Sequence, residues 1–519
     1  MLQNRIGYSF LVEHYALRAR ALQLYARIDA GTKGRKQTRM GDQMVLLVAP
    51  DYQPEATLAG HLQFALRYEG VNLEVLALLF TSDRFGRDGQ EALEQWLATS
   101  PESRYARRAG FLYEWLTNHT LKAEVPSKAA YVHAVDERLQ FAAATTGTRN
   151  GKYRVLDNLP GTADFCPLVR KTAYLEQHGS EQLRQLTATT LAQYDANLLR
   201  RAAAFLYLKE TQSSFELERE KPSASKAQRF ADLLRQAEVG EPLTQEQLAQ
   251  LQRAVVDPRF HEFAWRTEQN WIGQDLGFRK KIDFVPPRPE DVPALMTGLL
   301  AMAERARDGW KQQSVAENAD PVVTTAMVAF GFVFIHPFMD GNGRLHRYLI
   351  HALLAAAGFT PRGIVLPVSA VILANLDDYI AVLEQFSRPL LALTDYDPEM
   401  PAIPAKGNDA VYYRYFDATE QAEFLCRALL RTVQEDLVQE IDFIIGFDRA
   451  RQGLNALLDW PAHAMDLFVK CVRQHGGHLS NAKRNSHFSW MMEQEVAAAE
   501  AIVSEAFGNN ALDSNDPET

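Results

Sequence analysis

The sequence predicts a mainly α-helical protein, and three observations support this fold class. From about residue 190 to 393, apolar residues recur three and four positions apart in long segments, which is the spacing of amphipathic helices. The same spacing returns in TEQAEFLCRALLRTVQEDLVQEIDFII, beyond residue 418. By contrast, QMVLLVAP, which ends at Pro50, has the run of apolar residues expected of a strand. We therefore expect a central all-helical domain, a mostly helical (α+β) N-terminal domain and a helical C-terminal domain.

Breaks in these patterns predict the domain boundaries. We expect an N-terminal domain at 1–189, the central domain at 190–393, a linker at 394–410 and a C-terminal domain at 411–519. The linker, LTDYDPEMPAIPAKGNDA, is rich in Pro, Asp and Ala and lacks periodicity. TTGTRNGKYRVLDNLPGTADFCP has the Gly, Asn and Pro content of a long surface loop. For the basic run in GGHLSNAKRNSHFSW we weigh a winged-helix-like turn against a solvated polar loop, and favour the loop.

Composition and charge narrow the classes of protein to consider. The 519 residues are 47% hydrophobic and 23% charged, with a net charge of -10. This acidic balance argues against nucleic acid or a membrane surface as the general partner. No apolar segment is long enough to span a bilayer, and the N-terminus lacks the pattern of a signal peptide. The widely spaced Cys166, Cys426 and Cys471 suggest reduced thiols, so we expect a cytoplasmic protein.

The stretch HPFMDGNGRLHR, residues 336–347, lies between two apolar helical segments. His336 precedes a proline, which disfavours the α region, so the first helix is expected to end there. Leu345, Leu349 and Leu353 are four apart and predict the buried stripe of a second helix that begins near Asn342 or Gly343. The turn between the helices therefore opens onto a helix N-terminus, where N–H groups and the helix dipole favour an anion.

Side chains in this turn suit a phosphate chain with a proton acceptor beside it. Glycines 341 and 343 let the backbone approach a phosphate closely, and Arg344 and Arg347 add forked donors. Asp340 alone would repel phosphate, but Mg²⁺ bridging the two removes that conflict. His336 has an intrinsic pKa suited to a general base. A GNG turn or a single His before Pro is usually structural, but the combination makes a structural role alone a poor explanation.

At every specified position this stretch resembles the signature of the Fic (filamentation induced by cAMP) family, HPFx(D/E)GNGRxxR. The resemblance implies a Fic domain with a β-hairpin flap that transfers AMP from ATP to a Ser, Thr or Tyr hydroxyl of a target protein. It implies these roles: His336 as general base, Asp340 as Mg²⁺ ligand, Asn342 with the backbone of Gly341 and Gly343 as anion hole, Arg344 and Arg347 on the outer phosphates, and Phe338 as a buried anchor.

Two further segments resemble parts of the family pattern. WIGQDLGFRKKIDFVPPRP, from Trp271, resembles the flap that pairs with an extended target segment by strand addition. The corresponding residues here are Ile272, Gly273, Gly277 and Phe278, and an ordinary surface hairpin is the alternative. Tyr379, in DDYIAVLEQFS, stands where relatives contribute to the nucleotide-base pocket, although a Tyr on an amphipathic helix is more often packing.

A regulatory element is suggested upstream, in ETQSSFELERE. Ser214 and Glu218 match the family's inhibitory pattern (S/T)xxxE(G/N), whose glutamate pairs with the second motif arginine, here Arg347. Arg219 departs from this pattern, which puts the tightness of inhibition in question. Ser213 and Glu216 also have capping-box spacing, which would start a helix, and both roles can hold because an inhibitory helix needs a start. Some self-inhibited relatives remove AMP with the same glutamate, and the sequence leaves this open.

Three functions remain in competition at this stage. The first is AMP transfer to a protein, regulated by Glu218. The second is another transfer within the same fold, of UMP, phosphocholine or a phosphoryl group, and the intact GNGR core favours a nucleotide. The third is an ATP-binding regulatory module without transfer, which the presence of His336 disfavours. The flanking segments look like those of large bacterial Fic proteins, and the resemblance also implies a tendency to form homodimers.

Overall fold

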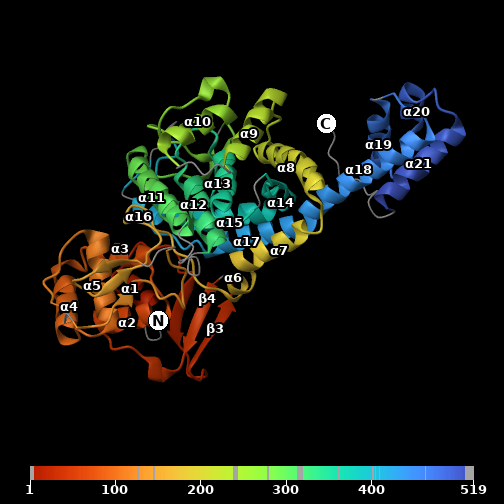
Figure 1. The fold of residues 1–519 in the computed structure, drawn as a ribbon. Helices are drawn as coiled ribbons and strands as arrows, with labels where there is room; N and C mark the ends of the chain where they lie inside the picture. Colours follow the sequence, from red (N-terminus) through yellow and green to blue (C-terminus); the bar gives the residue numbers. More distant parts are fainter. Residues whose placement is uncertain are drawn as a thin grey trace.

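The computed structural model describes residues 5–41, 43–124, 128–143, 147–237, 243–277, 280–311, 320–360, 363–399, 403, 405–407, 409–461 and 463–508. The protein is mainly α-helical with small sheets, as predicted (Figure 1). Short 3-10 segments lie at Pro50–Tyr52, Pro258–Phe260 and Pro289–Asp291. None of the helices in these ranges combines the length and the apolar character that a bilayer crossing requires.

The N-terminal region combines a four-stranded sheet with five helices. The strands are β1 (Arg5–Ile6), β2 (Leu24–Ile28), β3 (Arg35–Met40) and β4 (Gln43–Val48), in the order β1-β2-β4-β3. The helices are α1 (Tyr8–His14), α2 (Leu58–Tyr68), α3 (Leu73–Thr81), α4 (Gly86–Thr99) and α5 (Arg104–Thr117). β4 is the strand that the sequence predicts. β3 was not predicted, because its residues, RKQTRM, are polar and mostly exposed.

The segment expected to be a long surface loop is instead folded into the body of the protein. It contributes β6 (Thr148–Asn150) and β7 (Val155–Asp157), which form a three-stranded sheet with β5 (Val132–His133). Tyr153, Leu159 and Phe165 are fully buried. The expectation was wrong because the Gly, Asn and Pro residues mark only the turns, whereas the bulky apolar residues between them pack into the core.

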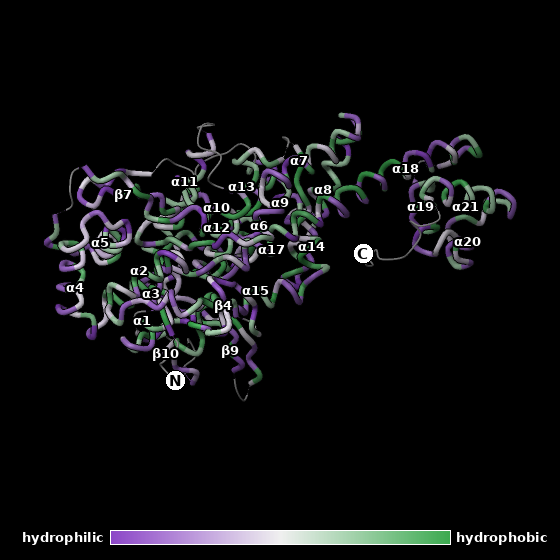
Figure 2. The backbone as a smooth tube through the Cα atoms, turned by 90° about the horizontal axis from the view of Figure 1, so that it is seen from below, coloured by the Kyte–Doolittle hydropathy of each residue, from purple (hydrophilic) through white to green (hydrophobic). Residues whose placement is uncertain are grey.

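The central region is a helical assembly around one large apolar core. Its helices are α6 (Ala173–His178), α7 (Ser180–Leu191), α8 (Ala196–Glu216), α9 (Ala224–Ala237), α10 (Gln245–Val255), α11 (Val292–Lys311), α12 (Pro321–Ile335), α13 (Asn342–Ala356), α14 (Val368–Ala374) and α15 (Leu376–Leu391). The hairpin of β8 (Ile272–Asp275) and β9 (Lys280–Phe284) projects from this body (Figure 2). α12 is buried along almost its whole length and packs against α13.

Beyond α15, β10 (Asp395–Tyr396) pairs with β11 (Ala405–Lys406), and α16 (Ala410–Arg414) follows. α17 (Thr419–Arg431) continues through a π-helical segment (Thr432–Asp436) into α18 (Leu437–Leu457) without a break. The first part of this long helix lies in the central core, and its far end joins a separate apolar cluster with α19 (Ala464–Gln474) and α21 (Glu493–Phe507) (Figures 1 and 2). Most of the basic run expected to be a polar loop is the exposed helix α20 (Asn481–His487).

Candidate active site

The ends of two packed helices define the motif loop, residues 336–341. α12 ends at Ile335, and His336 takes up a left-handed conformation with φ of 52°. Gly341 has φ of 92°, a conformation that favours glycine, and α13 begins at Asn342. Both helix boundaries lie where the sequence predicts them, and Leu345, Leu349 and Leu353 are buried as expected.

Contacts within the motif fix the shape of the loop. Asn342 accepts a hydrogen bond from the backbone N–H of Phe338 (3.1 Å) and donates one to the carbonyl of the same residue (2.7 Å). Phe338 is fully buried, as predicted, and its ring lies 5.2 Å from that of Trp265. Both polar groups of the Asn342 side chain are thus used within the loop. The group that this residue can offer to an anion is its backbone N–H, which belongs to the first turn of α13 and has no partner within the helix.

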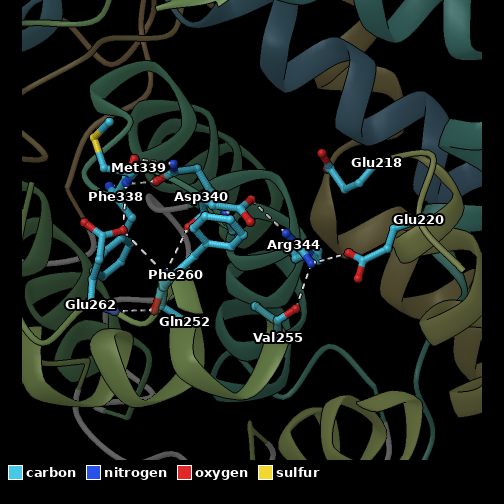
Figure 3. A network of polar contacts seen from close by, with 12 residues as sticks. Glu218, Glu220, Gln252, Val255, Phe260, Glu262, Phe338, Met339, Asp340 and Arg344 are labelled. Carbon is cyan, nitrogen blue, oxygen red and sulfur yellow. Dashed lines mark hydrogen bonds and ion pairs between the residues drawn. The ribbon is translucent and has the colours of Figure 1, made fainter. Parts of the chain in front are cut away.

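The connection between α10 and β8 supports the loop from outside, a role that the sequence did not reveal. Arg266 donates from Nε to the carbonyl of His336 (2.8 Å) and from its backbone N–H to the carbonyl of Pro337 (2.8 Å). Glu262 accepts from the backbone N–H of Met339 (2.8 Å) and is linked to Gln252 (Figure 3). These residues have no motif of their own. The only available signal was a cluster of polar residues just before the hairpin.

His336 has the protonation state that a general base needs. Its Nδ1 lies 3.1 Å from the carbonyl oxygen of Val333, and because a carbonyl can only accept, Nδ1 carries the proton. The other ring nitrogen, Nε2, is therefore the one with a free lone pair. Burial lowers the pKa of His336 to about 4, so the imidazole is neutral near pH 7. A neutral imidazole of this tautomer accepts a proton at Nε2.

Asp340 is the one carboxylate within the motif loop itself. Its side chain is half exposed, and it accepts a hydrogen bond from Nη2 of Arg344 (2.9 Å). No group of three or more His, Cys, Asp or Glu side chains in the described part of the chain is arranged to hold a metal ion. One exposed carboxylate beside a phosphate-binding turn fits Mg²⁺ that takes its remaining ligands from phosphate oxygens and water.

Both motif arginines are turned toward the C-terminal end of α8. Arg347, only 2% exposed, donates from Nε to the hydroxyl of Ser214 (2.8 Å) and from Nη2 to the carbonyl of Ser214 (2.7 Å). The same Nη2 donates to Glu218 (2.8 Å). Arg344 donates to Glu220 (2.6 Å), to Asp340 and to the carbonyl of Val255 (2.7 Å), as Figure 3 shows. The predicted pair of Glu218 and Arg347 is thus present, whereas Glu220 was missed.

Residues 217–220, which we call the terminal turn, end α8 in a Schellman motif. The N–H of Arg219 bonds to the carbonyl of Glu216 (2.8 Å), and the N–H of Glu220 bonds to that of Phe215 (3.1 Å). Arg219 occupies the left-handed position of this motif, with φ of 56°. Ser213 and Glu216 lie in the last turn of α8, so the alternative that they start a helix is wrong: the helix begins at Ala196.

The carboxylate of Glu218 lies close to Gly343 and is ionised. A Cβ on residue 343 would lie 2.1 Å from Oε1 of Glu218, so the glycine leaves room for the carboxylate above the start of α13. Burial raises the pKa of Glu218, but the ion pair and hydrogen bond with Arg347 outweigh it. The net pKa is below the usual range, and the carboxylate is charged at neutral pH.

Of the predicted flap residues, Ile272 and Gly273 lie in β8 and Gly277 lies in the turn that follows it. Ile272 pairs with Phe284, and a bulge separates this pair from Gly273 and its partner Ile282. β9 packs against α15, whereas all residues of β8 are exposed, so β8 provides a free strand edge. Gly277 has φ of 79° in the turn, and Phe278 lies outside the described residues.

Tyr379 lies in the core beneath Arg347. It is 7% exposed and packs among Phe330, Phe424 and His346. Burial raises its pKa to about 12, although Arg347 opposes this through its charge and a hydrogen bond. In this position Tyr379 supports Arg347 from the side of the core. The sequence placed it at a nucleotide-base pocket, a role that nothing in these contacts tests.

Comparison with known proteins finds one family model that matches this part of the chain. A sequence model described as the Fic/DOC family matches residues 242–354. That range covers α10, the hairpin, the motif loop and most of α13.

Individual relatives match a short part of the chain. A protein of Nematostella vectensis named "Protein adenylyltransferase Fic" is 39% identical over 79 residues, which is 15% of this chain and 17% of the relative. A protein of the same name from Drosophila willistoni is 39% identical over 77 residues, 15% of this chain and 14% of the relative. The chain therefore spans about a sixth of the length of these relatives. A solved Fic family protein from Desulfovibrio desulfuricans G20 has a TM-score of 0.37 and 18% identity, covering 65% of this chain and 86% of that one.

Proposed function

We propose, from the match of the Fic/DOC family model to residues 242–354, that the chain is a protein adenylyltransferase, which transfers AMP from ATP to a Ser, Thr or Tyr hydroxyl of a target protein. One observation carries the proposal: a neutral imidazole with a free Nε2 lies in a loop that opens onto the start of a helix, and the first two turns of that helix carry two arginines. The names of the partial relatives support the same transfer.

The residues of this site suit an in-line transfer. In the proposed step, Nε2 of His336 accepts the proton of the target hydroxyl as its oxygen attacks the α-phosphorus of ATP. A bond forms between that oxygen and the α-phosphorus, the bond from phosphorus to the bridging oxygen breaks, and pyrophosphate leaves. The first-turn N–H groups of α13 stabilise the charge that develops on the α-phosphate. Mg²⁺, held by Asp340 and the phosphates, would supply further charge neutralisation.

Target binding is assigned to the hairpin. The exposed edge of β8 has backbone groups free to add a strand, and the supporting residues Arg266 and Asn270 connect the start of this hairpin to the motif loop. An extended target segment is the substrate class that such an edge accepts.

The three cysteines are buried and unpaired, which supports a reducing, cytoplasmic location.

We further propose that Glu218 inhibits the transfer. It occupies Arg347, which is otherwise available for an outer phosphate of ATP. A triphosphate that cannot reach this arginine is displaced at its α-phosphorus, and a displacement of about 1 Å can cost roughly 100-fold in rate. Removal of AMP from a modified target by the same glutamate remains a second candidate activity, supported by the position of Glu218 over the start of α13.

Isotope placement tests the proposed transfer. The full chain carrying Glu218→Gly, incubated with Mg²⁺ and a bacterial extract, is expected to label itself or a target from α-labelled ATP and not from γ-labelled ATP. Mass spectrometry of the labelled peptide checks for an added AMP on a hydroxyl. Label from the γ position alone would contradict AMP transfer and indicate a phosphoryl transfer, and normal ATP binding without any label would favour a regulatory module.

The low pKa of His336 predicts an unusual pH dependence. A group whose pKa is about 4 stays deprotonated down to pH 5, so labelling by Glu218→Gly at saturating ATP and Mg²⁺ is expected to vary less than about twofold between pH 5 and 7. For a histidine with the ordinary pKa of about 6.5, the rate would fall roughly 25-fold from pH 7 to pH 5. Initial rates measured across the range, with circular dichroism to confirm folding, distinguish the two. A midpoint near 6.5 contradicts the assignment of a partly buried, neutral base.

A further inference from the structure

The terminal turn carries two carboxylates, and they contact different arginines of the motif. Glu218 lies 2.8 Å from Nη2 of Arg347, and Glu220 lies 2.6 Å from Nη1 of Arg344. In Figure 3 both glutamates approach from the same element, the segment that ends α8. The inhibition proposed above uses only the first of these contacts, so the second needs an explanation.

The Schellman geometry explains why both contacts form together. The residue after the left-handed position turns back toward the helix, and the N–H of Glu220 is held by the carbonyl of Phe215 (3.1 Å). The two carboxylates stand on either side of Arg219, and each meets one of two arginines that are themselves three residues apart on α13. One turn of chain thus brings a carboxylate to each of the two motif arginines.

A second cation, on α9, also holds Glu220. Glu220 forms an ion pair with Lys226, at the start of α9, and the ring of Phe215 lies below both cations, 5.3 Å from Lys226 and 5.5 Å from Arg344. The side chain of Arg344 is only 4% exposed. Its terminal nitrogens are used by Glu220, the carbonyl of Val255 and Asp340. A phosphate that is to bind Arg344 must compete with Glu220 for Nη1.

From these contacts we infer that Glu220 is a second inhibitory carboxylate, which withholds Arg344 from the nucleotide as Glu218 withholds Arg347. The inference rests on the proposed function, since it assigns regulation to the same site. ATP binding then requires displacement of both acids, and removal of Glu218 alone leaves half of the phosphate clamp occupied. When Glu220 leaves Arg344, the arginine becomes available to a phosphate. Because Arg344 also donates to Asp340, the same change alters the surroundings of the carboxylate proposed to hold Mg²⁺.

ATP binding is the direct test, because it needs no transfer. Calorimetry on the full chain with Mg²⁺ compares Glu218→Gly with the double variant Glu218→Gly/Glu220→Gln. Glutamine keeps the shape of the side chain and removes its charge. We expect the double variant to bind ATP about tenfold more tightly than the single variant, the size expected for loss of one competing charge-assisted contact at a partly exposed site. Binding of AMP, which has no outer phosphates, is expected to change less than about twofold.

Two matched variants make the result specific to Glu220. Glu216→Gln makes the same chemical change on the exposed last turn of α8, away from the arginines, and is expected to leave ATP binding unchanged in the Glu218→Gly background. Glu220→Asp retains the charge, and in the Glu218→Gly background it is expected to keep the ATP affinity close to the low value of the single variant. Equal ATP affinity in the single and double variants, or weaker binding in the double variant at an unchanged melting temperature, would overturn the inference.

The outcome for Glu220 is separable from the outcome for the proposed transfer. Tighter ATP binding by the double variant, without label from α-labelled ATP in any variant, would support the second inhibitory contact and reject adenylyl transfer. Label from the α position with no effect of Glu220→Gln on ATP affinity would support the transfer and reject the second contact.

Discussion

The variant Glu218→Gly is expected to transfer label from α-labelled ATP about 100 times faster than the parent chain. In the parent, Glu218 holds Nη2 of Arg347, and Nε and Nη2 of this arginine also donate to Ser214. Removing the carboxylate returns one nitrogen to the outer phosphates, and the α-phosphorus moves into line with the attacking hydroxyl. The measurement is the initial rate of labelling at several ATP concentrations, so that binding and turnover are separated.

The control for this variant keeps the backbone and changes only the charge. Glu218→Gln removes the ion pair while retaining side-chain shape, and it is expected to activate in the same direction as Glu218→Gly, whereas Glu216→Gln is expected to have no effect. If all three variants label at the rate of the parent, the inhibitory role of Glu218 is wrong. Since a charged Glu218 is the inhibitory form and its pKa lies below the usual range, inhibition persists through neutral pH and weakens only in acid.

The second large effect is expected from His336→Ala, introduced into the Glu218→Gly background. Loss of the general base is expected to lower the transfer rate by about 1,000-fold. Affinity for ATP is expected to be unchanged, because His336 contacts the carbonyl of Val333 and its proposed role is toward the target hydroxyl. Labelling rates and calorimetry on the same preparations check both halves of this prediction.

An exposed histidine provides the comparison for this loss. His119→Ala makes the same truncation on the surface of the N-terminal region and is expected to keep full activity. Transfer that persists in His336→Ala would exclude this residue as the base. A fall in ATP affinity equal to the fall in rate would instead show that the residue acts in binding, and the assignment of Nε2 as the proton acceptor would be wrong.

The sequence was sufficient to predict the parts of the fold that depend on local chemistry. Pro337 and Gly341 determine where α12 ends and α13 begins, and the leucines four apart determine which face of α13 is buried. The pair of Glu218 and Arg347, 129 residues apart, was also within reach, because a family pattern specifies both members. Backbone preferences of single residues and the spacing of residues within a known motif can both be read from one sequence.

Contacts made only by tertiary packing were out of reach. Glu262 and Arg266 hold the motif loop because the chain after α10 returns to it, and nothing in their own neighbourhood predicts that return. β3 is a strand because β4 lies beside it, although its polar residues give no strand pattern. Glu220 was overlooked for a related reason: its significance depends on a turn geometry that places it on Arg344.

The left-handed backbone of Arg219 bears on how readily the proposed switch opens. For a residue with a side chain, this conformation costs roughly 1 kcal/mol relative to the usual helical region, whereas glycine adopts it with little penalty. The cost falls only on the form in which the terminal turn is intact, so it narrows the gap between the closed and open states. Since 1.4 kcal/mol is a factor of ten, the open population is raised about fivefold over that of an otherwise identical chain with glycine. Arg219, the residue that departs from the family pattern, therefore shifts the equilibrium of the terminal turn toward the open state before ATP binds.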